Sequence, residues 1–355
     1  MAVRNGAVQL SIGMVELSKD KVTRMGLGTG LNQRALTIFQ QAIADESSLR
    51  IQSLTLDCGA TLIDFGVATA GGLAAGVRLA SICMAGQADI TIVPGDRAVW
   101  SGPWVQVSTE RPIEACMLSQ YAGWPVKQGD FFAMGSGSMR VRRGREPLLE
   151  SLGAKETSEI AVGTLECDRM PTGDLVEFMA AECSVAPSEM WLAVAPTRSI
   201  AGCVQVVARS VETALHKLHE LGFPLEQVNA AYGNAPLPPS TPNFAKGIGR
   251  TNDAILYGAH VTLWVSGEDD QIASVCEGLP SSASKDFGSP FAEIFKQYDY
   301  DFYKVDPGLF SPAEVVMVNQ ASGNSWRCGA MRPELIAKSF GTQSISSPSR
   351  KIGFK

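Results

Sequence analysis

The stretch RSIAGCVQVVARSVETALHKLHEL, residues 198 to 221, decides how the rest of the chain is interpreted. It predicts one long amphipathic helix, because apolar residues recur at helical spacing and form one stripe: Val204, Val207, Ala208, Val211, Leu215 and Leu218. Ser199 is the expected N-cap and Gly222 the expected residue after the C-cap. Pro224 prevents the helix from continuing.

A line of polar residues follows one flank of this predicted helix. Arg209, Glu212, His216 and His219 are separated by three, four and three residues. At about 100° per residue they lie along one edge of the apolar face. The residues expected to face solvent lie further round the helix: Ser210, Thr213 and Lys217. Polar groups at the border of a buried face are well placed to line a cleft between two packed bodies.

Two other interpretations of this flank stay open at this point. Arg209 and Glu212 have the spacing of a surface ion pair, which stabilises a helix by only a few tenths of a kcal/mol. His216 and His219 have a spacing that metal ligands also use, but no third ligand is close in the sequence. We therefore expect ordinary interfacial histidines and no metal site.

Composition and charge exclude several classes of protein. Hydrophobic residues make up 45% of the 355 residues and charged residues 19%, as in globular proteins with a sizeable core. The net charge of -6 argues against nucleic acid as the main partner. No signal peptide and no run of about 18 apolar residues is visible, so we expect a cytoplasmic protein that does not bind membranes. Eight cysteines without metal-ligand spacing are expected to be reduced thiols.

The order of apolar runs and turn signals predicts an α/β fold with two domains and a ligand cleft between them. Residues 1–30 are expected to form an arm, 31–150 a first domain and 151–340 a second, with C-terminal strands free to return to the first. The charged segment 142–156 is the expected linker, and 341–355 a disordered tail. Strands are predicted at 51–56, 61–67, 90–93, 104–108, 160–165, 191–195, 227–231, 260–265 and 313–319. Helices are predicted at 33–44 with Asn32 as cap, 72–85, 113–121, 172–183 and 291–298.

Three polar segments are candidates for ligand binding. Gly135-Ser136-Gly137-Ser138, in FFAMGSGSMR, offers backbone N–H groups and two hydroxyls after an apolar strand, although a plain tight turn has the same sequence. Arg250 to Asp253 precede an apolar helical segment, 255–257, and follow the proline-rich stretch 234–242, which we expect to be an extended loop. Ser281 to Asp286 precede another helix. Such clusters also cap helices.

The chain resembles the methenyltetrahydromethanopterin cyclohydrolase family. The segments that carry the resemblance are SICMAGQADI, SQYAGWPV, FFAMGSGSMR, ARSVETALHKLHELGF, GRTNDAILYG, PSSASKDFG and YKVDPGLFSPAEV, which extend from about residue 31 to residue 319. The resemblance implies cytoplasmic homotrimers of two-domain α/β subunits with a pterin between the domains. It implies reversible addition of water to the 5,10-methenyl cation, giving the 5-formyl compound, with no cofactor and no metal. It also places an essential arginine and glutamate at Arg209 and Glu212, in the pattern R-x-x-E.

The residue types fit this chemistry. Glu212 could orient a water molecule and accept its proton, and Arg209 would hold Glu212 in place and favour its ionised form. Asn252 and Asp253 could pair with the amide-like and guanidine-like edges of a pterin ring, the aspartate accepting from N–H donors. The anionic tail of the carrier could contact Lys285 together with Ser281 and Ser282. The Gly135–Ser138 loop gains a ligand-binding interpretation from the same resemblance.

Overall fold

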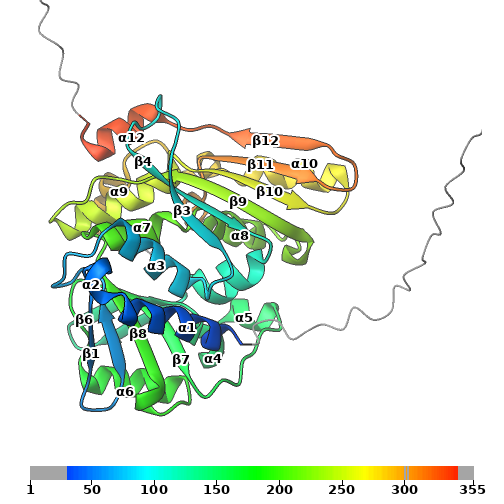
Figure 1. Ribbon diagram of the computed structural model, residues 1–355. Helices are drawn as coiled ribbons and strands as arrows, with labels where there is room; N and C mark the ends of the chain where they lie inside the picture. The colour runs from blue at the N-terminus through cyan, green and yellow to red at the C-terminus, as the bar shows by residue number, and fades with distance from the viewer. Residues whose placement is uncertain (1–29, 300, 302–303, 343–355) are drawn as a thin grey trace, which may run out of the picture.

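The structure is a computed structural model that describes residues 30–299, 301 and 304–342. The predicted arm and tail therefore lie almost entirely outside the described residues. Two six-stranded sheets with helices packed against them form an α/β fold, as predicted from the sequence (Figure 1). No helix in the described ranges combines the length and the apolar character needed to cross a bilayer.

The first sheet has the strand order β1-β2-β8-β7-β6-β5. Strands β2, β8 and β7 are parallel, and the other pairs are antiparallel. Their bounds are β1 (Gln52–Thr55), β2 (Thr61–Asp64), β5 (Trp124–Gln128), β6 (Phe131–Ser136), β7 (Ala161–Glu166) and β8 (Met190–Ala195). Asp64, Glu166 and Ala195 end the three parallel strands at one edge of the sheet, which is the edge where ligands commonly bind in α/β proteins.

The second sheet has the order β12-β11-β10-β9-β4-β3 and is antiparallel except for the pair β10 and β11. Its strands are β3 (Asp89–Pro94), β4 (Pro103–Thr109), β9 (Val228–Pro236), β10 (His260–Val265), β11 (Glu314–Asn319) and β12 (Ser325–Gly329). The proline-rich loop begins later than predicted, because β9 continues through Pro236 as an inner strand beside β4. β12 was not predicted.

The two sheets do not divide the chain at residue 150. β3 and β4, from the first predicted domain, pair with the C-terminal strands, and β7 and β8, from the second, join the first sheet. The predicted boundary falls between β6 and β7, which are hydrogen-bonded neighbours. Nor is 142–156 an open linker. Arg140 and Glu146 form a buried ion pair, and Arg143 and Arg145 both bind Glu182.

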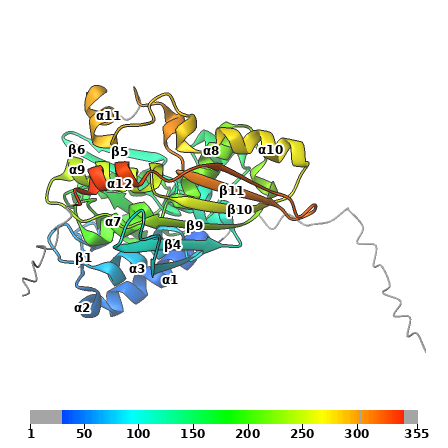
Figure 2. The same ribbon diagram turned by 90° about the horizontal axis from the view of Figure 1, so that it is seen from above.

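Helices fill the space between the sheets and cover the far face of the first. α3 packs against α7, and both lie between the two sheets, while α6 packs on the opposite side of the first sheet (Figure 1). α8 and α10 pack against the second sheet, as the view from above also shows (Figure 2).

The helices up to residue 182 are α1 (Leu31–Ala44), α2 (Glu46–Leu49), α3 (Leu73–Cys83), the π-helix η1 (Ile113–Gln120), α4 (Met139–Arg143), α5 (Pro147–Ser151) and α6 (Gly173–Glu182). The later ones are η2 (Pro187–Glu189), α7 (Ile200–Val207), α8 (Ser210–Glu220), η3 (Leu225–Gln227), α9 (Phe244–Leu256), α10 (Asp269–Gly278), η4 (Ser281–Ala283), α11 (Phe291–Gln297), η6 (Pro307–Leu309) and α12 (Pro333–Phe340).

The long helix predicted at 198–221 is two helices, α7 and α8, that meet at Ala208 and Arg209. Its apolar stripe is fully buried, as predicted. Ser199 caps α7 by accepting the Gly202 N–H at 3.0 Å. At the other end Gly222 has a φ of 78°, and the Phe223 N–H donates to Leu218 O, as in a Schellman motif.

Two further details differ from the sequence-based expectations. Asn32 does not cap the first helix. It lies inside α1 and its buried amide binds Glu156, the Ser138 carbonyl and the Val162 N–H. Ser210, expected to face solvent, is buried against β9. Both side chains face packed layers that the local sequence does not reveal.

Candidate active site

Arg209 lies at the junction between α7 and α8, in a buried position with 7% of its surface exposed. The helix is interrupted here, with φ −81° and ψ 6° at Arg209. Its Nη1 donates to the Gln120 carbonyl at 2.5 Å, at the end of η1. Its Nη2 donates to Ser136 Oγ at 3.1 Å, at the end of β6. The guanidinium therefore connects α8 to the first sheet.

Glu212 lies one turn further along α8, and its Oε2 is 3.7 Å from Arg209 Nη1. It is 5% exposed, so the surface ion-pair interpretation is wrong: both partners are buried. Burial raises the pKa of the Glu212 carboxyl, and the nearby Arg209, His216 and Arg140 side chains partly offset the rise. A carboxylate with a raised pKa is a better proton acceptor than a solvated one.

Aromatic and basic side chains lie beside this pair. Tyr121 stacks on His216, with ring centroids 4.9 Å apart, and the Arg140 guanidinium lies 4.9 Å from the Tyr121 ring centroid. Burial and the charge of Glu212 raise the pKa of Tyr121 to about 12, so the phenol stays protonated. The π-helix η1 that ends at Gln120 is a rare conformation that is frequent at functional sites.

Behind Arg209 lies a buried network of hydroxyl, thiol and amide groups. Ser136 Oγ is 2.7 Å from Thr164 Oγ1, and both approach Cys83 Sγ, at 3.4 and 3.2 Å. Gln205 on α7 donates to the same sulfur at 3.4 Å. The network fixes Ser136, which in turn accepts from Arg209.

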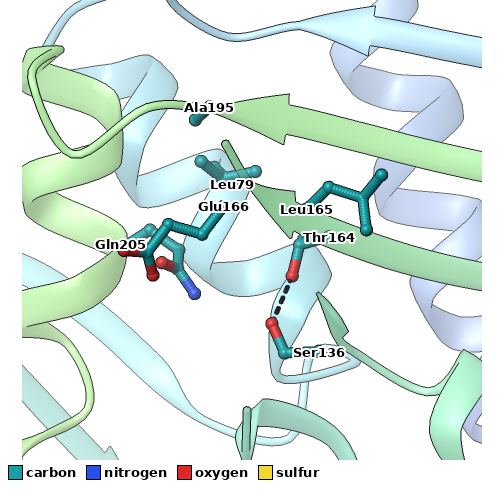
Figure 3. A pocket seen from close by; sticks show the side chains of 7 residues that line it. All are labelled: Leu79, Ser136, Thr164, Leu165, Glu166, Ala195 and Gln205. Atoms are coloured by element: carbon teal, nitrogen blue, oxygen red, sulfur yellow. Dashed lines mark hydrogen bonds between the residues drawn. The ribbon is translucent and has the colours of Figure 1, made fainter. Parts of the chain in front are cut away.

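A small pocket opens next to this network (Figure 3). Three apolar side chains and four polar ones line it: Leu79, Leu165, Ala195, Ser136, Thr164, Gln205 and Glu166. Glu166 and Gln205 extend toward the same space from β7 and α7. Burial raises the pKa of the Glu166 carboxyl and Arg209 lowers it, which places this second carboxylate within the field of the Arg209 guanidinium.

Of the predicted loop Gly135–Ser138, only Ser136 reaches Arg209. Gly135 and Ser136 still belong to β6. The Gly137 N–H donates to Ser119 O at 2.7 Å, and Ser138 Oγ donates to the Val162 carbonyl at 3.2 Å. The Gly137 N–H and the Ser138 hydroxyl are therefore already used within the protein.

Asn252 and Asp253 lie inside α9, which begins at Phe244, and not ahead of a helix as predicted. The Asn252 amide donates to Ile248 O at 2.9 Å. Asp253 is fully buried and accepts from the Phe291 N–H at 2.7 Å and from Ser339 Oγ at 2.5 Å. Both of its oxygens are used to hold α11 and α12 against α9.

The second polar cluster also stays apart from Arg209. Ser281 is buried and donates to the Leu256 carbonyl at 2.5 Å. Ser282 and Lys285 are exposed, and the Lys285 N–H donates to Asp306. Ser281 therefore supports the fold, while the side chains of Ser282 and Lys285 remain accessible.

His216 contacts two side chains within the protein. His216 Nδ1 is 3.9 Å from Glu220, in addition to its stacking on Tyr121. No cluster of three or more His, Cys, Asp or Glu side chains that could hold a metal ion occurs among the residues described. All eight cysteines are free thiols, six of them buried.

Sequence analysis missed Glu166, Gln205 and Tyr121. Glu166 had one available signal, since it directly follows the apolar strand 160–165 and so falls at the carboxyl edge of a parallel sheet. Gln205 lies within an apolar helix and Tyr121 at a helix end. Neither position has a local pattern that distinguishes it from a core residue.

The chain belongs to the cyclohydrolase (MCH) family, whose model matches residues 30–340. It is 48% identical over 333 residues to a protein of Rhodopirellula baltica. The aligned region covers 92% of this chain and all of that protein. The chain is 43% identical to one of Methylobacillus flagellatus (89% of this chain, 96% of that protein) and 39% identical to one of Methanococcoides burtonii (89% and 99%). Each of the three is named methenyltetrahydromethanopterin cyclohydrolase.

The burial of Asp253 predicts a specific dependence of stability on pH. Burial raises the pKa of its carboxyl from 3.8 to about 7 in the folded protein. Between pH 4 and 7 the unfolded chain has released this proton and the folded chain retains it. Stability should therefore fall as the pH rises through this window, by at most about 1.4 kcal/mol per pH unit.

Asp253→Asn keeps an acceptor for Phe291 and a partner for Ser339 but cannot ionise. Its unfolding free energy, measured by urea titration at pH 5, 6 and 7, should change less than that of the wild type. Asp270→Asn, at an exposed position of α10, is the matched control and should keep the wild-type slope. Parallel slopes for Asp253→Asn and the wild type would contradict the assignment.

Proposed function

We propose that the chain catalyses the reversible hydrolysis of 5,10-methenyl-tetrahydromethanopterin to 5-formyl-tetrahydromethanopterin, a reaction of one-carbon metabolism. The observation that carries the proposal is the buried pair of Arg209 and Glu212 in a chain that matches named cyclohydrolases over nearly its whole length. In this proposal the substrate binds beside this pair.

The methenyl carbon shares a positive charge with two nitrogens and is already an electrophile. The reaction requires a positioned water, a base for its proton and a proton for the departing nitrogen. Glu212 accepts a proton as the water oxygen bonds to the methenyl carbon, and it returns that proton to the nitrogen whose bond to carbon breaks. The hydroxyl proton then leaves as the formyl C=O forms. One proton is released overall, which balances the charge of the cation.

Arg209 supports this chemistry through its position. Its contacts with Gln120 and Ser136 hold the guanidinium beside Glu212 and keep the carboxylate aligned. Its charge also opposes the effect of burial on the Glu212 pKa and so favours the ionised form of the carboxyl. Because the electrophile carries its own charge, we propose that no metal and no cofactor is required. The assay below tests two alternatives: a zinc-dependent hydrolase that uses His216, His219 and a carboxylate, and a non-catalytic pterin-binding protein.

The purified protein, dialysed against a chelator, should consume methenyl-tetrahydromethanopterin, and the near-ultraviolet absorbance of the substrate should disappear. Methenyl-tetrahydrofolate under the same conditions is the comparison substrate. Activity that is lost on chelation and restored by zinc would favour the zinc hydrolase, and absence of turnover would favour the binding protein.

Glu212→Gln keeps the size of the side chain and removes its basicity. Turnover should fall by about 10²-fold or more, with a smaller effect on substrate affinity. Arg209→Ala should also lose activity, and the double variant should be little worse than the worse single one, because the two residues act as a unit. Near-wild-type kcat in a folded Glu212→Gln protein would remove this mechanism.

We also propose that the subunits form a cytoplasmic homotrimer, on the family resemblance alone. Light scattering of the purified protein should give three times the subunit mass, and a monomer mass would contradict the trimer.

A further inference from the structure

Among the buried carboxylates of the described chain, Glu212 alone lacks a partner within hydrogen-bond distance, and the half-buried Glu166 lacks one as well. Within hydrogen-bond distance of a neighbour are Asp64, Glu146, Glu156, Asp253 and Glu314. Glu212 has only the 3.7 Å contact with Arg209. Glu166 forms no hydrogen bond or ion pair with any residue in the described ranges that would occupy its oxygens. Both carboxylates lie near the Arg209 guanidinium.

The position of Glu166 is that of a ligand-binding group. It ends β7 at the carboxyl edge of the parallel strands and lines the pocket together with Gln205 (Figure 3). Gln205 donates one N–H to Cys83, which leaves its amide oxygen and its second N–H without a partner in the described chain. The pocket thus offers a carboxylate and an amide side by side.

Part of the pocket lining is apolar, which is compatible with contact to a flat ring. Leu79, Leu165 and Ala195 supply apolar surface on the same pocket. The pocket measures only about 10 Å³, so we infer that it receives no more than the polar edge of a ring, and that the rest of the ring stays outside. Ser136, which lines the pocket, accepts a hydrogen bond from Arg209 and so connects the pocket to the buried pair. An apolar site with a few convergent polar groups is the usual form of a small-molecule site.

The chemistry of a pterin edge matches these groups. Its guanidine-like part presents two adjacent N–H donors, which a carboxylate with both oxygens available can accept together. Its amide-like part presents a carbonyl and an N–H, which a glutamine amide can pair with. Asp253 was the sequence-based candidate for this role, but both of its oxygens are bonded within the protein.

We propose that Glu166, with Gln205 beside it, binds the polar edge of the pterin ring and so orients the methenyl carbon toward Glu212. The proposal rests on the proposed function and names two substrate-binding residues for the same site. Glu166 has a second effect there: its negative charge favours the cationic methenyl substrate over the neutral formyl product.

Glu166→Gln tests the proposal, because it keeps the shape and replaces one acceptor by a donor. KM for methenyl-tetrahydromethanopterin should rise about 10- to 100-fold, the range for losing a hydrogen bond to a charged group, while kcat changes by less than about threefold. Calorimetry with the 5-formyl product should show weaker binding in a measurement that needs no turnover. Glu166→Asp keeps the charge, withdraws it by one methylene and should give an intermediate KM.

Glu159→Gln is the matched control. It removes the same charge from an exposed position just before β7, outside the pocket, and should leave KM, kcat and product binding unchanged. Thermal unfolding establishes that each variant is folded, and Glu166→Asp provides the test if Glu166→Gln is not.

Two outcomes would overturn the proposal. Wild-type KM and product affinity in folded Glu166→Gln would show that the edge of the ring is bound elsewhere. A large loss of kcat at unchanged KM would assign Glu166 to proton transfer instead. Both results require a wild-type protein that turns the substrate over, so they differ from a failure of the proposed function, in which the wild type itself is inactive.

Discussion

The Arg209 guanidinium is the group on which the arrangement of the site depends. A buried cation is stable only when acceptors match its N–H donors. The acceptors around Arg209 come from three separate elements. Gln120 supplies a carbonyl from the end of η1, Ser136 a hydroxyl from the end of β6, and Glu212 a carboxylate from α8. The break between α7 and α8 lets one residue leave the helical path and reach all of them. The same contacts hold the layer of the first sheet against the helices of the second.

Sequence patterns predicted the parts of the fold that depend on local periodicity. The apolar stripe from Val204 to Leu218, the Ser199 cap and the turn at Gly222 are all present, because each depends on neighbours within one or two turns of helix. The interruption at Arg209 was not predictable, since no glycine or proline marks it. The exchange of strands between the two sheets was equally hidden: β4 pairs with β9, more than a hundred residues away, and local sequence holds no record of such pairing.

The residues of the candidate site were likewise predictable only where their proximity depends on local spacing. Arg209 and Glu212 lie three residues apart on adjoining helical turns, so their proximity could be predicted from spacing. Asp253 and Ser281 are polar residues beside apolar helical segments, a pattern shared by binding sites and by groups that tie helix ends together. The structure shows that these two tie elements together. Glu166 and Gln205 are brought to one pocket by β7 and α7, and only the folded chain shows that they share it.

Two carboxylates around one guanidinium have a consequence for the charge of the site. Glu212, Glu166 and Arg209 together carry one net negative charge when both acids are ionised, and a methenyl cation bound beside them would bring the total to zero. In the proposed mechanism Glu212 takes a proton as water adds, so the substrate loses its positive charge and Glu212 loses its negative charge in the same step. The total stays at zero, so the buried surroundings need not reorganise around a new net charge, which is the situation in which preorganised groups are most effective. With one carboxylate alone the bound cation would leave the site positive. Glu166 would therefore stabilise the bound cation through its charge, independently of the hydrogen bonds that it can accept.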